Sequence, residues 1–537
     1  MLKKLLALFL LSLVAAPSLA ASAKPNIIYV LCDDLGYGDV RALNPEGKIA
    51  TPNLDRLAAQ GIAFTDAHTG SAVCSPTRYG VITGRYCWRS PLQKHVLGGL
   101  SPRLIEPGRY TVANLLKDHG YHTACVGKWH LGMNWARLPG KPIEDLAIEK
   151  PDQVHNVDYS KPITEGPNSV GFDYYYGISA SADMVPYTFI ENDHVTILPT
   201  VEKSFPIVSG HPERRSRLGP AAPDFELEDI LPTLTSKAIE YVRSRAEAAK
   251  RGEPFFMYLP LASPHAPIAP SKNWLGKSGI NPYADFVMQT DDSIGQLLRS
   301  LDELGLADNT LVIVTSDNGC SPVANFEELL AKGHNPSYVF SGEKADIYDG
   351  GHRVAFLVRW PGKVQGGRQS DHLMCHTDFM ATVADILETK LPATAAEDSI
   401  SFLGALTSSD APPAREVIVH HSINGAFALR RGMWKLEFCP GSAGWSKPRP
   451  GINDTSKLPL VQLYNLQRDI GEQTNLQGEQ PAIVAELTKL MEQNVTQGRS
   501  TPGAPQQNTV AVDFWKAGKQ DHQPLPPRKP RAKKAAR

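Results

Sequence analysis

Four apolar runs, each ending abruptly at polar or charged residues, constrain the fold of this chain more than any other feature. They cover residues 26–31, 123–126, 255–259 and 311–315. Continuous apolar runs of this length are typical of strands that are buried on both faces, as in a parallel sheet. Helical patterns such as 285–304 lie between them. The alternation predicts an α/β domain with a large mixed, mostly parallel sheet sandwiched by helices.

The pattern changes near residue 406. Closely spaced strand-like runs follow at residues 416–420, 426–430 and 433–438, and a helical pattern then begins at Pro481. They predict a smaller C-terminal subdomain, an antiparallel sheet packed with one helix. After residue 498 the composition becomes polar, Pro-rich and finally basic, which is typical of a flexible tail. The expected units are a catalytic domain, a subdomain and a tail at residues 24–405, 406–498 and 499–537.

The N-terminus predicts export. Lys3 and Lys4 precede an apolar run at 5–16, and small residues offer cleavage sites after Ala20 or Ala23. This pattern is typical of a secretory signal peptide, and the run is too short for a membrane span. We therefore expect a periplasmic or secreted protein.

Charge and cysteine content exclude other classes. The net charge is −1, so no overall field attracts nucleic acid or an anionic membrane. The seven cysteines are scattered and contain no CxxC pair. A disulfide framework is therefore not expected, although one or two bridges remain open outside the cytoplasm.

Polar side chains gather where the apolar runs end. Asp33 and Asp34 follow the first run, and Asp317 and Asn318 follow the last. Ligands in doubly wound folds bind outside the carboxyl ends of the strands. Carboxylate and amide oxygens suit Ca²⁺ or Mg²⁺ rather than zinc. The sequence thus predicts a hard-cation site at this edge of the sheet.

Cys74 lies next to an expected helix start. Ser75 is placed to act as the N-cap, Pro76 suits the first turn, and Gly84 suits the helix end. Arg78 lies four residues after Cys74, on the same helix face. A sulfur group at a helix N-terminus beside a guanidinium favours an anion site. The spacing alone leaves open a buried structural cysteine before an ordinary helix.

Residues 74–85 read Cys-x-Pro-x-Arg followed by Thr-Gly-Arg, and this segment resembles the signature of the type I sulfatases. In that family the cysteine is oxidised to formylglycine. Residues 33–39, 127–132 and 315–319 resemble further motifs of the family, and the similarity extends from about residue 25 to 476. The resemblance implies an alkaline-phosphatase-like fold and a sulfuric ester hydrolase that depends on a formylglycine-generating maturation enzyme.

The resemblance also assigns residues. It implies a catalytic set of Cys74, Arg78, Lys128, His130, His265 and Lys344. It implies a calcium ion, in preference to magnesium, bound by Asp33, Asp34, Asp317, Asn318 and the modified Cys74. His265 would protonate the leaving oxygen, and His130 would take the proton whose removal expels sulfate. Substrate would be held by Lys128, His265 and Lys344, and sugar-pocket candidates are Asp183, Asp346, His334 and His421.

The substrate follows from weaker similarities. Residues 79–80, 85–89 and 182–187 resemble a bacterial branch named arylsulfatase or N-acetylgalactosamine-6-sulfatase. They favour a sulfated polysaccharide or glycosaminoglycan fragment, attacked at an end, as the natural substrate, and an aryl sulfate remains open as a substrate. One alternative is a phosphatase or phosphonate monoester hydrolase of the same superfamily. Another is a non-catalytic binder of sulfated glycans, if Cys74 stays unmodified.

Overall fold

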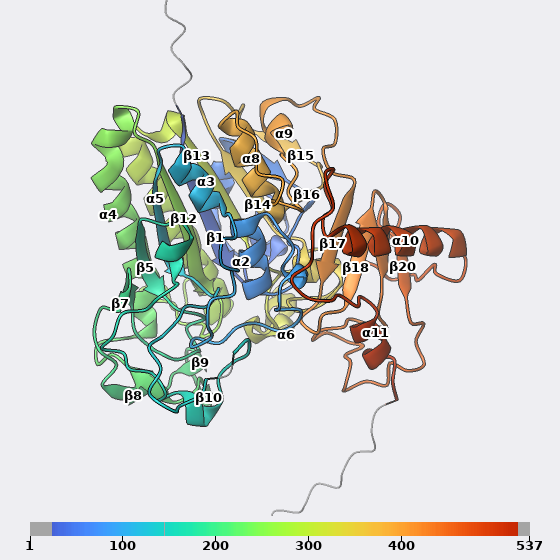
Figure 1. The fold of residues 1–537 in the computed structure, drawn as a ribbon, viewed down its shortest axis with the longest axis horizontal. Helices are drawn as coiled ribbons and strands as arrows, with labels where there is room; N and C mark the ends of the chain where they lie inside the picture. Colours follow the sequence, from blue (N-terminus) through green and yellow to red (C-terminus); the bar gives the residue numbers. More distant parts are fainter. Residues whose placement is uncertain (1–23, 144, 525–537) are drawn as a thin grey trace, which may run out of the picture.

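The computed structural model describes residues 24–143 and 145–524. A ten-stranded sheet runs through the main body, in the order β15-β2-β14-β13-β1-β12-β4-β5-β6-β7, with helices on both faces (Figure 1). Five adjacent strands pair in parallel: β13 (Thr310–Ser316), β1 (Asn26–Asp33), β12 (Phe255–Pro264), β4 (His122–Lys128) and β5 (Tyr174–Ile178). Four of them contain the apolar runs, so the predicted mostly parallel sheet is confirmed.

The edges of the sheet make it mixed. On one side lie β14 (Phe356–Arg359), β2 (Ile62–Phe64) and β15 (Arg368–Ser370). On the other side lie β6 (Ile190–Glu191) and β7 (His194–Val195). β14 is antiparallel to both of its neighbours, and so is β6. These strands are short, and their sequences carry no long apolar run.

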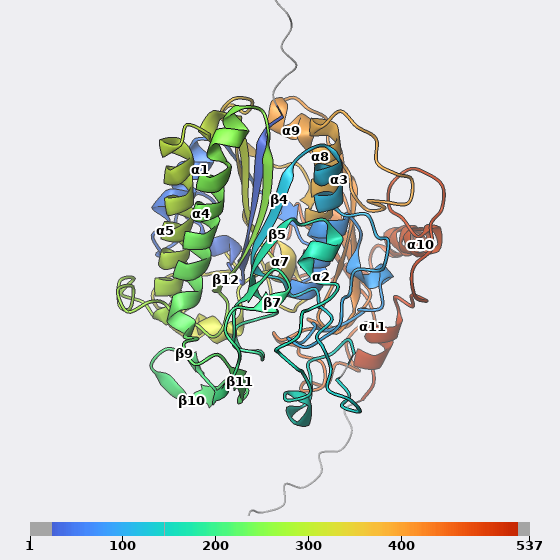
Figure 2. The same cartoon turned by 60° about the vertical axis from the view of Figure 1, so that its left-hand side comes forward.

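Two hydrophobic cores cover the two faces of the sheet. Along β1, Ile28, Val30 and Cys32 belong to one core, whereas Ile27, Tyr29 and Leu31 belong to the other. The first core contains α1 (Pro52–Ala59), α4 (Ile230–Lys250) and α5 (Pro282–Glu303). The second contains α2 (Cys74–Thr83), α3 (Val112–Asp118) and α8 (Phe379–Ile386), as Figure 2 shows. Because successive side chains point to opposite faces, burial of both faces requires an uninterrupted apolar run.

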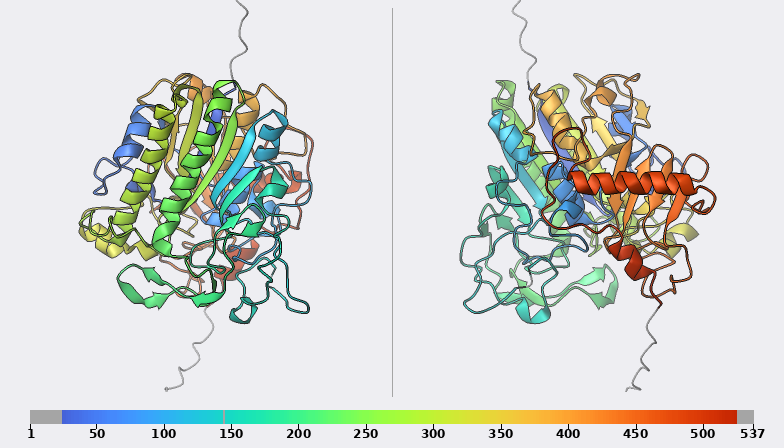
Figure 3. Two further views of the ribbon diagram at one scale, coloured as in Figure 1. Left: turned by 90° about the vertical axis from the view of Figure 1, so that its left-hand side faces the viewer. Right: turned by 45° about the vertical axis from the view of Figure 1, so that its right-hand side comes forward.

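A second sheet lies beside the main body. Its antiparallel order is β17 (Val417–His421), β18 (Phe427–Arg431), β19 (Trp434–Glu437) and β20 (Gln462–Asn465). α10 (Pro481–Gln497) lies across it (Figure 3) and packs against β18 and β19 through a third core. The predicted antiparallel sheet with one helix is confirmed, and β20 is an additional strand that periodicity did not indicate.

Shorter elements complete the described chain. The remaining strands are β3 (Ala67–His68), β8 (Val201–Lys203), β9 (Pro206–Val208), β10 (His211–Arg215), β11 (Gly219–Ala221) and β16 (Met374–Cys375). The remaining α-helices are α6 (Phe326–Ala331), α7 (Asp349–His352), α9 (Leu403–Thr407) and α11 (Lys516–Asp521). Single 3-10 turns occupy Tyr37–Asp39, Cys87–Arg89, Pro151–Gln153, Pro167–Val170, Leu227–Asp229, Ala307–Asn309, Pro322–Ala324 and His376–Asp378.

The expected flexible tail is wrong for residues 499–524. This segment packs on the main body and carries α11. Gln507 accepts a hydrogen bond from Arg85 at 3.1 Å, and Thr509 donates its backbone N–H to Arg89 O at 2.8 Å. Arg85 and Arg89 are fully buried, so they need these partners. The expected 405/406 boundary falls inside α9. The signal peptide and residues 525–537 lie outside the described residues.

All seven cysteines are buried and free, so the structure contains neither of the bridges left open above. Among the described residues, no helix combines the length and the apolar character needed to cross a bilayer.

Gly127 allows β4 to lie close to β12, which contains Pro260. Its φ is +140°, and a Cβ atom there would lie 1.9 Å from Pro260 O. We expect Gly127→Ala to lower the free energy of unfolding by about 3 kcal/mol, since both the clash and the backbone strain must be relieved. Gly120→Ala is the control: its φ is +82° but nothing lies within 4 Å, so about 1 kcal/mol is expected. Urea denaturation measures both, and equal losses would contradict this account.

Candidate active site

The strand order brings the predicted site residues to one edge of the main sheet. Asp33 ends β1, Lys128 ends β4, Asp317 follows β13 and His265 follows β12. In the sheet these strands lie in the order β13-β1-β12-β4 and run parallel. Their carboxyl ends therefore meet, although the residues are far apart in the sequence.

The oxygen-bearing side chains predicted to be ligands form a compact buried group. Asn318 Nδ2 donates to Asp34 Oδ1 at 2.7 Å, and Asp34 N donates to Asp317 Oδ1 at 3.3 Å. Asp34 is held at φ +64°. Three buried oxygens lack a hydrogen-bond partner in the described part of the chain: Asp33 Oδ1, Asp34 Oδ2 and Asn318 Oδ1. Buried unpaired oxygens are costly, so this donor set fits a hard cation such as calcium.

His265 lies next to the same carboxylates. Its Nε2 is 3.7 Å from Asp34 Oδ2, and His265, Asp33 and Asp34 each place one possible ligand atom within 4.8 Å of the others. Burial, followed by the charge of Asp33, raises the pKa of Asp317 to about 7. A cation among these oxygens would favour the ionised carboxylates.

Three buried cations, Lys128, Lys344 and Arg78, balance the charge of three buried carboxylates, Asp33, Asp34 and Asp317. Lys128 Nζ lies 2.5 Å from Asp33 Oδ2, and Lys344 Nζ lies 2.5 Å from Asp34 Oδ1. Although burial raises it, the pKa of Asp33 lies well below its ordinary value because Lys128 and other cations stabilise the carboxylate. The six groups cancel in charge, so a bound divalent cation would leave the site positive and attractive to an anionic ester.

Arg78 contacts two of the candidate metal ligands, Asp317 and Asp33. Its Nε and Nη2 donate to Asp317 Oδ2 at 3.2 and 2.8 Å, and its Nη1 donates to Lys128 O at 2.8 Å. Nη2 also lies 3.3 Å from Asp33 Oδ2. With these donors occupied, Arg78 orients Asp317 and the end of β4.

Cys74 is the first residue of α2, which corrects the predicted cap. The N-cap is Val73, and Ser75 Oγ instead accepts the backbone N–H of Leu97 at 3.2 Å. The helix ends at Gly84 with φ +64°, as expected. Burial raises the pKa of the Cys74 thiol despite the opposing charges of Lys128 and Lys344. The unmodified side chain is therefore a neutral thiol and a weak nucleophile.

His130 presents a free basic nitrogen. Its Nε2 lies 2.8 Å from Leu97 O. A carbonyl only accepts, so Nε2 carries the proton and the lone pair is on Nδ1, which has no partner in the described chain. Burial, and then the charges of Lys128 and Arg78, place the pKa of His130 well below its ordinary value. The ring is neutral and able to accept a proton.

A cavity of about 430 Å³ opens beside Cys74. His265, Lys344 and Asp183 line it together with Cys74. Its other walls are largely apolar: Val73, His95, Val96, Leu146, Ala147, Ile148, Ser181, Met184, Ile423 and Trp445. Asp183 Oδ1 and Ser181 Oγ are buried without a hydrogen-bond partner among the described residues. Such groups suit the hydroxyls of a sugar.

Three sugar-pocket candidates do not line this cavity. Asp346 holds the loop that carries Trp445, since its Oδ1 accepts the backbone N–H groups of Trp445 and Ser446 at 2.6 and 3.1 Å. His334 Nε2 pairs with Asp39 Oδ1 at 2.8 Å. His421 is buried in β17. Sequence reasoning missed most of the wall residues. Met184 lies in the segment 182–187 singled out above, but the others come from loops that no motif or periodicity links.

Comparisons with known proteins agree on the family. A sulfatase family model matches residues 25–389. The N-acetylgalactosamine-6-O-sulfatase of Bacteroides thetaiotaomicron is 35% identical, over 88% of this chain and 93% of that protein. Human arylsulfatase A is 28% identical, over 90% and 89% of the two chains.

Solved structures show the same relationship. A Bacteroides thetaiotaomicron structure described under the metabolism of multiple glycosaminoglycans aligns with a TM-score of 0.73 at 34% identity, covering 88% of this chain and 99% of that chain. A sulfatase from Pseudoalteromonas sp. shares the fold at 23% identity, with a TM-score of 0.65. The chain therefore belongs to the sulfatase family and is a sulfuric ester hydrolase.

Proposed function

We propose that this enzyme removes sulfate from sulfated polysaccharide or glycosaminoglycan fragments, with 6-O-sulfated N-acetylgalactosamine at a chain end as the expected sugar. The sugar is suggested by the 35% identical N-acetylgalactosamine-6-O-sulfatase, which aligns over most of both chains. The observation that carries the proposal is the group of unpaired oxygens and lysines beside Cys74, which lines a cavity together with Lys344, Asp183 and Ser181.

Asp33, Asp34, Asp317 and Asn318, with the modified Cys74, are the residues that would bind calcium. Their unpaired buried oxygens support this assignment. When present, calcium would supply positive charge at the sulfate oxygens, and the hydrated formylglycine would supply the attacking hydroxyl. The protein would be exported through the predicted signal peptide. A separate maturation enzyme would be needed to oxidise Cys74 to formylglycine.

Lys128 and Lys344 would bind the sulfate oxygens. Both lysines are buried beside the metal ligands, and the charge that develops on those oxygens is stabilised best by fixed cations in a water-poor site. Arg78 acts as a positioning residue because its donors are engaged by Asp317 and Lys128 O.

The two histidines take opposite parts in proton transfer. His130 accepts a proton at Nδ1, the nitrogen that its hydrogen bond to Leu97 leaves free. His265 lines the cavity, where it can protonate the leaving oxygen. Burial, and then Lys344, lowers the pKa of His265. An anionic ester bound beside it counteracts this shift and favours the protonated acid.

A panel of esters tests the proposal. We expect the kcat/KM of the purified enzyme for 4-nitrophenyl sulfate to exceed that for 4-nitrophenyl phosphate by at least about 10²-fold. The reason is that the proposed cation site and the two lysines are arranged for a sulfate ester. Among chondroitin disaccharides, we expect the 6-sulfated isomer to release sulfate faster than the 4-sulfated isomer. A preference for phosphate would favour the phosphatase alternative. Binding of sulfated glycans without turnover of any ester would favour the non-catalytic binder.

A further inference from the structure

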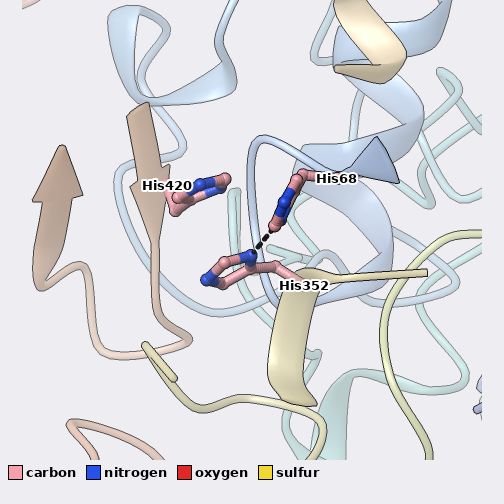
Figure 4. Close-up of side chains that lie close together, drawn as sticks. All are labelled: His68, His352 and His420. Carbon is pink, nitrogen blue, oxygen red and sulfur yellow. Dashed lines mark hydrogen bonds between the residues drawn. The ribbon is translucent and has the colours of Figure 1, made fainter. Parts of the chain in front are cut away.

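Three buried histidines meet outside the cavity that contains Cys74. His68 ends β3, His352 ends α7 and His420 lies in β17 (Figure 4). All three are fully buried, and one ring nitrogen of each lies within 4.8 Å of those of the other two. The cluster therefore joins the main body to the C-terminal sheet at a place where the proposed reaction uses no side chain.

Two of the rings have their protons fixed by the acceptors beside them. His68 Nε2 lies 2.9 Å from Asp66 Oδ1, and His420 Nδ1 lies 2.9 Å from Thr69 O. Arg430 Nη1 also lies 3.1 Å from His68 Nε2, but it is closer to Asp66 Oδ1, at 2.7 Å, so the guanidinium donates to the carboxylate. Each of these nitrogens must therefore carry the hydrogen of a neutral ring. The lone pairs are left on His68 Nδ1 and His420 Nε2, and the latter has no hydrogen-bond partner in the described chain.

The third ring is fixed in the same way. His352 Nε2 lies 3.0 Å from Ile347 O, so it donates there and leaves its lone pair on Nδ1. Lys435 Nζ also lies 3.3 Å from Nε2, but Ile347 O, Asp349 and Glu472 are all closer to that ammonium. The opposite tautomer of His352 would point a lone pair at the Ile347 carbonyl.

Two lone pairs consequently face each other. His68 Nδ1 and His352 Nδ1 are only 3.1 Å apart, a distance that is repulsive unless a cation lies between them. Burial lowers the pKa of each of the three histidines, so all are in the neutral form that coordinates metals. The hydrogen bonds to Asp66, Ile347 and Thr69 match those that orient metal-binding histidines.

We propose that His68, His352 and His420 form a second metal site, for a divalent transition ion of the zinc class. Three imidazoles favour such an ion over calcium, and a fourth position remains for water. Tetrahedral Zn–N bonds place ligand nitrogens about 3.4 Å apart, close to the His68–His352 distance. The rings of His352 and His420 are stacked with centroids 3.7 Å apart, so His420 must tilt to bring Nε2 to the ion.

The site has a structural role. His68 and Thr69 precede the segment that leads to Cys74, and His420 already binds Thr69 O. Coordination would fix this segment to β17 and α7. Zinc binding by these histidines is measured separately from calcium binding and from sulfatase activity.

Metal analysis of the full-length enzyme tests the site. The protein is loaded with Zn²⁺ or Co²⁺, freed of excess metal by gel filtration, and measured by mass spectrometry for metals and by visible absorption. We expect about one zinc per chain in addition to calcium, and a cobalt band typical of nitrogen ligands. His420→Gln should lose the band and bind zinc at least about 10-fold more weakly.

His421→Gln is the matched control. His421 is the next residue of the same strand, is equally buried, and lies outside the cluster. It should retain both zinc and the cobalt band. If His420→Gln fails to fold, the spectrum of the unaltered enzyme decides alone. Absence of both zinc and the cobalt band from that enzyme would overturn the proposal, and so would equal losses in the two variants.

Discussion

Cys74→Ala is expected to abolish sulfate ester hydrolysis, lowering kcat/KM for 4-nitrophenyl sulfate by at least about 10⁴-fold. The proposed nucleophile derives from this side chain, and the remaining lysines and histidines bind and transfer protons but supply no attacking group. The fold should persist, because alanine is a good helix former and Cys74 is the first residue of α2. Equal melting temperatures of variant and parent would separate lost chemistry from lost structure.

Cys87→Ala is the matched control for Cys74. Cys87 is also a buried, free cysteine, but its thiol contacts Ser90 and Leu92 O and does not line the cavity. Its removal should leave kcat/KM close to that of the parent. Mass spectrometry of the peptide that contains residue 74 should show an aldehyde in the active enzyme. Activity retained by Cys74→Ala, or a fully active enzyme with a thiol at residue 74, would contradict the mechanism.

The sequence allowed the proximity of the candidate metal ligands to be predicted because parallel strands convert a pattern along the chain into proximity in space. Asp33 and Asp317 are far apart in sequence, but their strands are neighbours in the sheet. Each apolar run marked a strand, and each polar residue after it marked the same sheet edge. Neither step required knowledge of side-chain packing.

Predictions that depended on local competition between hydrogen-bond partners were less reliable. Asp183 and Asp346 were equivalent candidates in the sequence, but backbone N–H groups occupy Asp346, whereas Asp183 Oδ1 has no hydrogen-bond partner within residues 24–143 and 145–524. Ser75 has the composition of an N-cap, but Val73 takes that position and Ser75 binds Leu97. Which acceptor receives which donor is decided by the tertiary fold, to which local propensity is only a weak guide.

The tail illustrates the same limit at a larger scale. Its polar, Pro-rich composition is typical of disorder. Arg89, however, is fully buried, and Asn508 Oδ1 accepts from its Nη1 at 2.9 Å. A buried guanidinium requires acceptors, and a segment that supplies them becomes ordered even when it contributes few apolar side chains. Composition describes the segment alone, whereas order depends on what the main body leaves unsatisfied.

Asp34→Asn is expected to remove calcium and to lower kcat/KM by at least about 10²-fold, since even indirect partners of a metal contribute 10- to 100-fold. Asp34 Oδ2 is one of the unpaired buried oxygens, and its Oδ1 lies 2.5 Å from Lys344 Nζ. The amide removes a negative charge from the cation site and releases the lysine. Calcium content and kcat/KM are measured on the same preparation.

Calcium-dependent stability gives an independent measure of Asp34→Asn. In the parent enzyme, calcium at about 100 times its dissociation constant should add about 2.7 kcal/mol to the free energy of unfolding, and this gain should vanish in the variant. Asp39→Asn is the control: Asp39 is equally buried, but its oxygens are already paired with His334, Tyr283 and Gly36 N. It should lower stability and still respond to calcium. A normal calcium response in Asp34→Asn, or its loss in Asp39→Asn alone, would place the ion elsewhere.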